Sequence, residues 1–433
     1  MSDVTVGLLG IVLLFILFGC GVEIGFAMAI VGFTGFAYLQ SFDSALVILG
    51  RDFFDVLSSY GYTVFPLFIL MGQIAYNAGI AGRLYDASYK FLGHIPGGLA
   101  MATVAAATAF KSICGSSTAT AATFSSVAVP EMEKHGYDKR LSTGVVATVG
   151  TLGAILPPSV NLIIYCVITE QSVGKLFIAG IIPGLIIAFM YMLTIYAWAK
   201  INPSVAPTGE KSAWIDRLKT LPEVAWILVI FILVVGGIMK GFFTPTEAGS
   251  VGFVGVFLLA FAKKTRSFRI YVRSFRETLR TSCMIFMLLA GSFILGRFIA
   301  ITNIPQAVAE WITLLKLNRY LIMAMIIIIY QIGGSFIEDL AFMILATPIF
   351  YPAMVKLGFD PVWIGIILGV TLMIGVVLPP MAIVVFVVSK ITNVPLNVVY
   401  KGVYPFLVAM VVGMILLFLF PGLALWLPSI LFK

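Results

Sequence analysis

The chain has 433 residues, of which 61% are hydrophobic and 11% charged, and this composition excludes a soluble globular protein because too little polar surface is available to cover it. An all-α polytopic membrane protein is expected. The net charge of +8 is attributed to Lys and Arg at the cytoplasmic face, with the lipid bilayer as partner and no nucleic acid. The cysteines Cys20, Cys114, Cys166 and Cys283 stand singly, so neither a disulfide framework nor a zinc site is predicted.

The first 96 residues predict membrane spans and interfacial helices. The hydrophobic stretch from Val6 to Val22 has no basic region before it, since the first Lys or Arg is Arg51, and we expect a retained helix rather than a cleaved signal. After it we expect a span at about 24–39, a charged interfacial helix at 41–58, a span at 61–79, and an amphipathic piece carrying Arg83, Asp86 and Lys90.

A re-entrant hairpin is predicted at about 97–130. This stretch is apolar but is interrupted by Gly115, Ser116 and Ser117, so each arm is shorter than the ~20 residues that cross a bilayer as a helix. Small residues with Ser and Thr also allow close helix packing, and this alternative reading applies to the hydroxyl residues beyond the tip. We name this element hairpin 1.

The next helix, at about 141–169, contains Pro157 and Pro158, which remove backbone donors and must break it. A span at about 174–199 completes the first half, residues 1–200. The stretch 201–222 carries prolines and a cluster of charges and is predicted to be a cytoplasmic linker.

The break motif occurs twice. Residues 153–158 read GAILPP and residues 375–380 read GVVLPP, 222 positions later, and Asp138 falls on Asp360 at the same offset. Broken helices are tolerated in lipid only beside protein or a cavity, so breaks at matching positions of two halves indicate a transport site. A simple proline kink without a ligand is the alternative.

The second half, residues 223–433, repeats the plan. We expect spans at about 222–240 and 246–262, a basic helix at 263–280, a span at 281–301, an interfacial piece around Trp311, hairpin 2 at about 318–353 with its tip at Gly333-Gly334-Ser335, a broken helix at about 361–391, and a last span at about 396–420.

Charge placement predicts the orientation. Seven Lys and Arg residues between 263 and 280 assign that segment to the cytoplasm, and counting spans from it places the linker inside and the N-terminus in the periplasm. Because each half has five crossings and one hairpin, the halves are expected to have opposite topology. Hairpin 1 then enters from the cytoplasm and hairpin 2 from the periplasm, which is the inverted repeat of many secondary transporters.

Two groups of cation ligands are expected, because sodium prefers several neutral oxygens and the prolines leave carbonyls free. The first group joins hairpin 1 to the first break and contains Ser112, Ser116, Ser117, Thr118, Gly150, Thr151, Gly153 and Pro158. The second group, at hairpin 2 and the second break, contains Gly333, Gly334, Gly375, Pro379 and Met381.

An organic anion is expected to contact Arg297, Asp339, Ser116, Ser117, Asn161 and Ser335. Arg297 lies within a predicted span, and an ionisable residue there is a functional candidate by default. Its expected partner is Asp339 in hairpin 2, and a purely structural ion pair is the alternative. Lys111 and Glu23 are expected to extend their charges to an interface.

These motifs together resemble the large membrane subunit, DctM-like, of the tripartite ATP-independent periplasmic (TRAP) transporters. The resemblance rests on GSS at 115–117, GTLGAILPPS at 150–159, Asp339, Thr347-Pro348, GFDP at 358–361 and the second Pro-Pro, and it covers essentially the whole chain. The family's second motif commonly reads Thr-Pro-Pro-x-Gly, whereas here Leu378 precedes the prolines. Backbone carbonyls or Thr371 would then complete the second sodium site.

The resemblance implies sodium-driven import of an organic acid by an elevator motion in a bacterial inner membrane. Sodium ions serve as coupling ions, and no other cofactor is implied. The implied partners are a small four-helix membrane subunit and a periplasmic substrate-binding protein. Residues of about 57–172 and 279–395 would form the moving transport domain, and the remainder would form the scaffold.

Other classes of function remain to be compared. A stand-alone sodium/anion symporter would show the same hairpins and breaks and differs in needing no binding protein. An intramembrane enzyme is not predicted, because the only histidines, His94 and His135, lie beside cytoplasmic ends and neither HExxH nor GxSxG occurs. A passive channel would not require matched broken helices.

Overall fold

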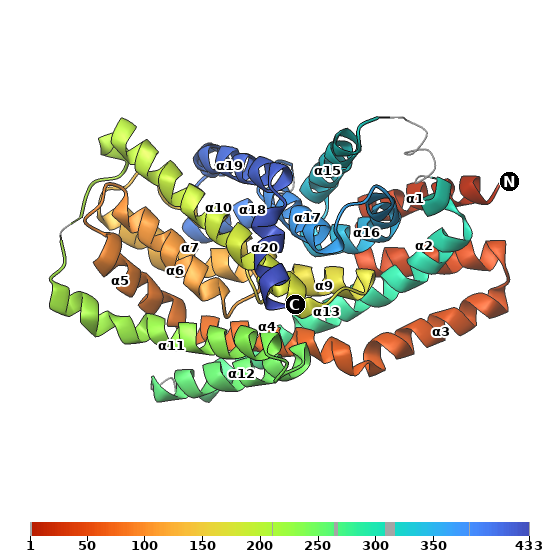
Figure 1. Ribbon diagram of the computed structural model, residues 1–433, viewed down its shortest axis with the longest axis horizontal. Coiled ribbons are helices and arrows are strands. Elements are labelled where there is room, and N and C mark those ends of the chain that lie inside the picture. The colour runs from red at the N-terminus through yellow and green to blue at the C-terminus, as the bar shows by residue number, and fades with distance from the viewer. Residues whose placement is uncertain (1, 210, 264–266, 308–316, 381, 433) are drawn as a thin grey trace.

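The computed structural model describes residues 2–209, 211–263, 267–307, 317–380 and 382–432, and the regular structure of these residues is helical, without a β-strand (Figure 1). The expected fold class is therefore confirmed. In the described residues, seven helices are long and apolar enough to cross a membrane, or eight if the bent pair of 42–58 and 60–77, which meet at 53°, forms one span. Two of the seven, Arg319–Phe336 and Asp339–Lys356, are the arms of the predicted hairpin 2. The number is below the ten crossings expected because the first two expected spans, Asp3–Gly19 and Ile24–Leu39, and parts of both broken elements are shorter apolar helices.

The elements of the first half follow the expected order. They are α1 (Asp3–Gly19), α2 (Ile24–Leu39), α3 (Phe42–Ser58), the 3-10 helix η1 (Tyr60–Thr63), α4 (Val64–Asn77), α5 (Ile80–Leu92), α6 (Gly98–Lys111), α7 (Ser117–Lys134), α8 (Lys139–Thr151), the 3-10 helix η2 (Leu152–Ala154), α9 (Val160–Thr169) and α10 (Val173–Ile201).

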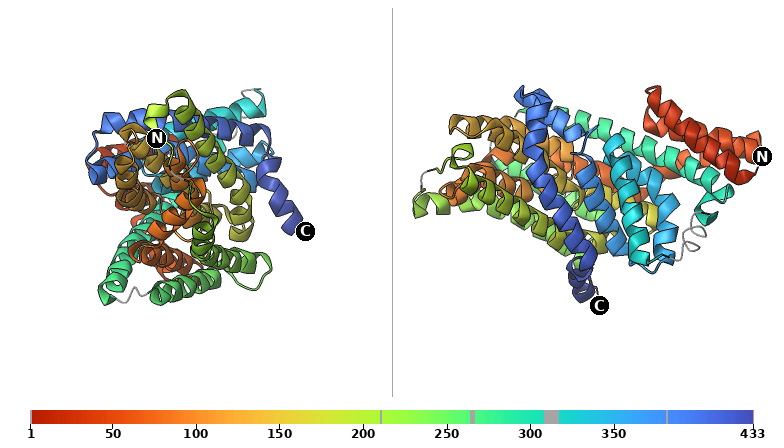
Figure 2. Two further views of the ribbon diagram at one scale, coloured as in Figure 1. Left: turned by 90° about the vertical axis from the view of Figure 1, so that its left-hand side faces the viewer. Right: turned by 90° about the horizontal axis from the view of Figure 1, so that it is seen from above.

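The elements of the second half are η3 (Pro203–Val205), α11 (Trp214–Met239), α12 (Pro245–Ala262), α13 (Phe268–Ile301), α15 (Arg319–Phe336), α16 (Asp339–Lys356), α17 (Pro361–Gly375), α18 (Ile383–Thr392), α19 (Leu396–Leu419) and α20 (Gly422–Leu431). The C-terminal helix α20 projects from the body of the molecule (Figure 2). This helix was not predicted from the sequence.

Aspartate caps begin both broken helices. Asp138 accepts a hydrogen bond from Arg140 N at 2.7 Å at the start of α8, and Asp360 accepts from Val362 N at 2.8 Å at the start of α17. The side-chain hydrogen bond from Arg140 lowers the pKa of the Asp138 carboxyl, so the cap stays ionised near the positive end of the helix. The two caps stand 222 positions apart, in the register of the repeat.

Helices of the first half pack against helices of the second half. Hairpin-1 helix α7 packs on α18, the second part of the other half's broken helix, and hairpin-2 helix α16 packs on α9 in the same way. Likewise α8 packs on α19 and α17 packs on α10, while α4 packs on α12 and α13 packs on α2. Each hairpin therefore contacts the broken helix of the other half as well as that of its own half, where α7 packs on α8 and α15 packs on α17.

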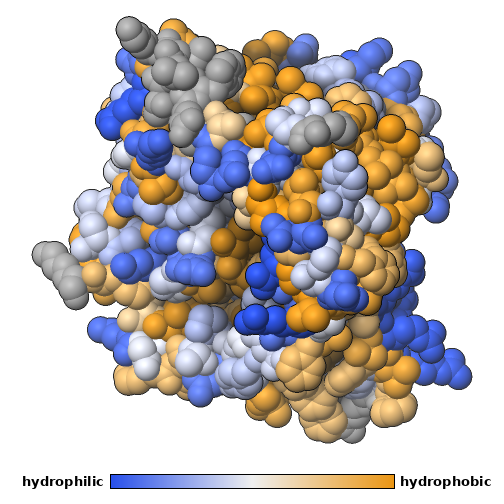
Figure 3. All heavy atoms as spheres, turned by 90° about the vertical axis from the view of Figure 1, so that its right-hand side faces the viewer, coloured by the Kyte–Doolittle hydropathy of each residue, from blue (hydrophilic) through white to orange (hydrophobic). Residues whose placement is uncertain are grey.

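The outer helices expose apolar side chains to the surroundings of the protein. Leu8, Leu9 and Phe15 on α1 and Trp226 and Ile232 on α11 are all at least half exposed. A water-soluble monomer rarely presents so continuous an apolar surface, so these faces suit lipid or a membrane partner. On the face that carries the N-terminal end, hydrophilic residues lie beside a central hollow and hydrophobic residues cover much of the rest (Figure 3).

Several expected boundaries are wrong. Helix α11 begins at Trp214, inside the expected linker, and continues through Pro222, while α13 joins the expected basic helix and span into one helix of 34 residues. Helices α7 and α16 continue past Pro130 and Pro352 because neighbouring groups in a packed bundle satisfy the backbone that a proline frees. The interfacial piece around Trp311 lies outside the described residues.

The tip of hairpin 2 also differs from expectation. Helix α15 continues through Gly333 and Ser335 to Phe336, and the tip is at Ile337 and Glu338. Gly333 is needed for packing rather than for a turn, because a Cβ there would overlap the ring of Phe342. Both arms of this hairpin have 18 residues and are long enough to cross a membrane, so its re-entrant character stays a prediction.

The contact of α8 with α19 generates a stability prediction. A Cβ on Gly402 would overlap Arg140 O and lie 3.0 Å from Gly144 Cα, so Gly402→Ala should force the helices apart and lower the free energy of unfolding by about 1–3 kcal/mol. Thermal unfolding in detergent measures this. The control is Gly50→Ala in exposed α3, where nothing lies within 4 Å and a gain of about 0.5–1 kcal/mol in helix stability is expected. Equal melting temperatures for the two variants would contradict the packing argument.

Candidate functional site

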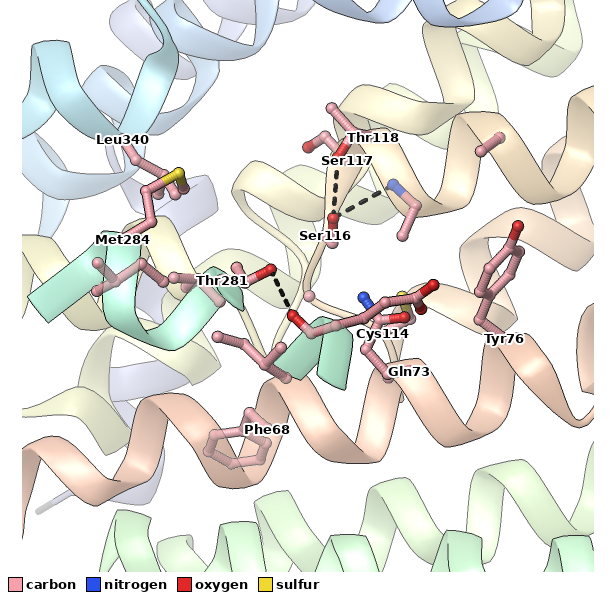
Figure 4. Close-up of a pocket in the computed structure, with 18 of the residues that line it drawn as sticks. Phe68, Gln73, Tyr76, Cys114, Ser116, Ser117, Thr118, Thr281, Met284 and Leu340 are labelled. Carbon is pink, nitrogen blue, oxygen red and sulfur yellow. Dashed lines mark hydrogen bonds between the residues drawn. The ribbon is translucent and has the colours of Figure 1, made fainter. Parts of the chain in front are cut away.

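A cavity of about 420 Å³ lies where both hairpin tips approach the first helix break. Of the residues expected at the site, Ser116, Ser117, Thr118, Asn161 and Asp339 line it. They come from three elements that are far apart in the sequence, and Figure 4 shows Ser116, Ser117 and Thr118 of hairpin 1 at the cavity. Residues Arg273 and Glu277 of α13 also line the cavity, so one side of it lies near the basic segment assigned to the cytoplasm.

Three helices begin at this cavity. Helix α7 begins at Ser117 and is capped by Ser116, whose Oγ accepts from Ala119 N at 3.2 Å, while α9 begins at Val160 and α16 begins at Asp339. The first N–H groups of a helix have no partner within it and carry partial positive charge. Their convergence makes the cavity favourable for an anion.

A buried hydrogen bond joins hairpin 2 to the first broken helix. Asn161 Nδ2 donates to Asp339 Oδ2 at 2.9 Å, and both residues are less than a tenth exposed. The partner of Asp339 is thus an amide and not Arg297, which corrects the expected pairing. An ionised carboxylate at the start of α16 is also favoured by the helix dipole.

The opposite wall of the cavity was not predicted. It consists of α4, with Phe68, Gln73 and Tyr76, and of α13, with Thr281 and Met284 (Figure 4). Gln73 Oε1 is buried there and has no hydrogen-bond partner within the described part of the chain. Helix α4 carries no break or charge cluster at these positions, and on α13 Thr281 and Met284 directly follow the basic segment, whose charges were used only to predict orientation. The packing of α4 and α13 beside the hairpins brings them to the site.

The structure brings most of the first cation group together. A Cβ on Gly150 would lie 3.2 Å from Ser117 O, and a Cβ on Gly115 would lie 2.8 Å from Pro158 O, so backbone of hairpin 1 meets backbone of the break directly. Ser112 and Thr151 donate their hydroxyl protons to Ala109 O at 2.6 Å and Thr148 O at 2.7 Å. Their oxygen lone pairs stay available to a cation.

Lys111 does not extend to an interface, contrary to expectation. Its side chain is fully buried, and Nζ donates to Ser116 O at 2.7 Å. The tip of hairpin 1 folds back over the last residue of α6, so the ammonium finds a carbonyl five residues ahead rather than water. Glu23, by contrast, is exposed at the start of α2.

The second cation group is also assembled. A Cβ on Gly375 would lie 2.8 Å from both C and O of Gly334, so hairpin 2 touches the end of α17 through glycine alone. With its amide oriented to satisfy both neighbours, Gln331 donates to Thr371 O at 3.1 Å and accepts from Gly375 N at 3.1 Å. Thr371 O and Gly375 N are four residues apart, the spacing of a hydrogen bond within an α-helix. Gln331 therefore provides hydrogen bonds to backbone groups at the end of α17. Gln331 was not predicted.

The remaining members of the expected set differ in position. Thr371 is buried and donates its hydroxyl to Ile367 O at 2.8 Å, Pro379 is exposed, and Met381 lies outside the described residues. Ser335 is buried in the last turn of α15, where its Oγ donates to Ile332 O at 2.7 Å. It does not line the cavity.

Arg297 belongs to a second cavity, of about 440 Å³. Its guanidinium contacts Asp52 of α3 with Nε at 2.7 Å from Oδ2 and Nη2 at 2.7 Å from Oδ1, and the Asp52 side chain is almost completely buried. Pro348 of α16 and Ile168 of α9 also line this cavity. Helix α13 therefore faces one cavity near Thr281 and another near Arg297.

The comparisons with known proteins agree with this architecture. The family model described as "Tripartite ATP-independent periplasmic transporter, DctM component" matches residues 11–423. The chain belongs to this DctM family. The C4-dicarboxylate TRAP transporter large permease protein DctM of Pseudomonas aeruginosa is 33% identical over 382 residues, which cover 88% of this chain and 89% of that protein.

Two further relatives of this DctM-family chain have other substrates in their names. The sialic acid TRAP transporter large permease protein SiaM of Vibrio cholerae is 30% identical over 415 residues, 95% of each chain. The isethionate TRAP transporter permease protein DctMQ of Oleidesulfovibrio alaskensis is 33% identical over 416 residues, covering 95% of this chain and 64% of that protein. These relatives are named as transporter permeases, in agreement with a non-enzymatic role.

A solved structure shows the same fold. The Alcanivorax borkumensis YdaH transporter matches with a TM-score of 0.62 over 88% of this chain and 89% of that one. Sequence identity is 11%, so the likeness concerns the fold alone.

The ion pair in the second cavity generates a prediction for this DctM-family chain. Arg297→Met leaves the buried Asp52 carboxylate without its counter-ion and should lower the free energy of unfolding by roughly 1–3 kcal/mol. Adding Asp52→Asn should restore part of this loss, as thermal unfolding of the double variant can measure. The control is Arg51→Met, because Arg51 is 71% exposed and its pair with Asp55 contributes at most about 1 kcal/mol. A melting temperature unchanged by Arg297→Met would show that the pair does not stabilise the fold.

Proposed function

We propose that this chain is the large membrane subunit of a sodium-driven importer of an organic acid anion, a carboxylate or a sulfonate, in a bacterial inner membrane. The observation that carries this proposal is the convergence of three helix N-termini on one cavity, beside the Asn161–Asp339 hydrogen bond. An anion bound there would accept hydrogen bonds from backbone N–H groups without needing a positively charged side chain. The substrates named for the relatives include C4-dicarboxylates, sialic acid and isethionate, which are organic acids.

An elevator motion accounts for the two cavities. Helices α4 and α13 pack on α12 and α2 on one side and face the hairpins across the first cavity on the other. We therefore assign α4 and α13 to the fixed scaffold, although the sequence placed α4 and the part of α13 from residue 279 onward in the transport domain. A hairpin unit sliding along α13 would carry its site between the cavity near Thr281 and the cavity near Arg297.

Arg297 has a role in the outer cavity under this proposal. Helix α3, with Asp52, belongs to the N-terminal side that the positive-inside count places in the periplasm. An arriving organic anion would compete with Asp52 for the guanidinium, which is 44% exposed. Arg297 would then contact the substrate on entry, and Asp339 would lie beside the substrate once it is bound at the hairpins.

Sodium coupling is proposed from the oxygen-rich contacts at the breaks. At the second break, Gly334 meets Gly375 closely and the Thr371 hydroxyl is near the end of the same helix. Neutral carbonyl and hydroxyl oxygens are the ligands that a sodium ion requires at a broken helix. Binding of the ion would hold hairpin 2 against α17.

We also propose two protein partners. The tripartite family description and the permease named DctMQ support a small four-helix membrane subunit. A periplasmic substrate-binding protein would deliver the substrate. The exposed apolar faces of the outer helices provide area for a membrane partner, since no other described part of this chain covers them.

The function is tested by uptake into proteoliposomes that contain this chain and its small membrane partner. Labelled organic acids should accumulate only with an inward sodium gradient and with the binding protein present. Accumulation without the binding protein would instead favour the stand-alone symporter. No accumulation with any organic acid under either condition would contradict the proposed transport.

A substitution in the second group tests sodium coupling. Thr371→Val removes one hydroxyl oxygen at nearly constant shape and should raise the sodium concentration for half-maximal uptake roughly tenfold, which corresponds to about 1.4 kcal/mol. The control is Thr143→Val, because Thr143 is also buried and donates to its own helix, at Lys139 O, but lies at the start of α8 away from both breaks. Identical sodium dependence in the two variants would remove Thr371 from the site.

A further inference from the structure

Lys111 is a buried positive charge that the proposed mechanism does not yet use. It is the last residue of α6, its side chain is fully buried, and Ser116 O accepts its hydrogen bond at 2.7 Å. Burying an ammonium in a membrane protein is unfavourable unless opposite charge or oriented dipoles compensate it. A side chain that only filled space would not require a charge at this place, so the charge itself needs an explanation.

The side chain of Lys111 extends between the two elements that form the first cation group. A Cβ on Gly153 would overlap Nζ and lie 3.0 Å from Cε and 3.1 Å from Cδ of Lys111. The lysine thus crosses the backbone of the break at Gly153 and ends at the carbonyl of the hairpin tip. Both residues are members of the first group, so the ammonium lies where a sodium ion would link hairpin 1 to the break.

The surroundings of Nζ suit a cation. The carbonyl end of α6, where Lys111 is the last residue, carries partial negative charge. Ser116 O is an acceptor of the kind that also ligates sodium. A sodium ion at the same oxygen would be repelled strongly by the ammonium at this separation in a medium of low dielectric constant.

The corresponding place in the second half contains no charge. The repeat offset of 222 aligns Lys111 with Gly333, and the helices that follow, α7 and α16, begin at residues separated by the same offset. Gly333 has no side chain to reach the break, and the neutral amide of Gln331 contacts the end of α17 instead. At this aligned position the first half therefore carries a positive charge and the second half does not.

We propose that the Lys111 ammonium takes the place of a sodium ion at the first site, so that this chain binds sodium at the second site and not at the first. The inference rests on the proposed sodium-coupled function and specifies which half binds the ion. The positive charge at the first site is then the Lys111 ammonium, which moves with hairpin 1. Fewer sodium ions therefore accompany each substrate than two symmetric sodium sites would require.

The test counts sodium ions bound by the purified full-length chain in lipid nanodiscs, with radioactive sodium as the probe. Lys111→Ala should bind one more sodium ion per chain than the wild type. The matched control is Lys134→Ala, which removes the same charge from the exposed end of hairpin 1, where Lys134 is 71% exposed and pairs with Glu131. This control should bind the same number of ions as the wild type.

The outcomes separate this inference from the proposed function. Equal, non-zero sodium binding by wild type and Lys111→Ala overturns the role of Lys111 and leaves sodium coupling intact, whereas absence of sodium binding in both overturns both proposals. If Lys111→Ala does not fold, the test uses Thr371→Val in the chain that retains Lys111. This variant should weaken all sodium binding at least about tenfold, because the second site is then the only one. A remaining sodium site of unchanged affinity would contradict the inference.

Discussion

The fold depends on hydrogen-bond partners for the backbone N–H and C=O groups that are left free at the two helix breaks. Two consecutive prolines end the helical ladder in each half, and no water of the bilayer core can replace the lost partners. The protein supplies them locally: Ser159 Oγ donates to Ala154 O at the first break, and Gln331 serves Thr371 and Gly375 at the second. Each break is therefore stable only with a hairpin against it.

This requirement explains the exchanged packing of the halves. Helix α7 covers α18 and helix α16 covers α9, so neither broken helix is complete without the other half of the chain. Glycine appears at the points of contact because backbone must approach backbone, as Gly334 does at Gly375. The candidate binding cavity is the space that remains where the hairpin tips, the breaks and α13 meet.

Charge is distributed unevenly over this nearly symmetric frame. Asp339 is held by Asn161 beside the cavity, Arg297 is held by Asp52 at the other end of α13, and Lys111 is enclosed within hairpin 1. Under the proposed transport function these differences would direct a substrate and a coupling ion to a defined side of the hairpins. The helices determine where these three charged residues lie, and the charges make the surroundings of the two hairpins different.

The sequence by itself determined the class, the broken helices and most helix boundaries, because apolar length, proline pairs and a repeat offset of 222 are local or periodic signals. It also selected Ser116, Asn161 and Asp339, which share one cavity. The tertiary structure decided what these signals cannot encode. Arg297 pairs with Asp52, 245 positions away, and α4 supplies a cavity wall without a motif. Such contacts follow from how helices pack in three dimensions, and residue spacing along the chain does not specify them.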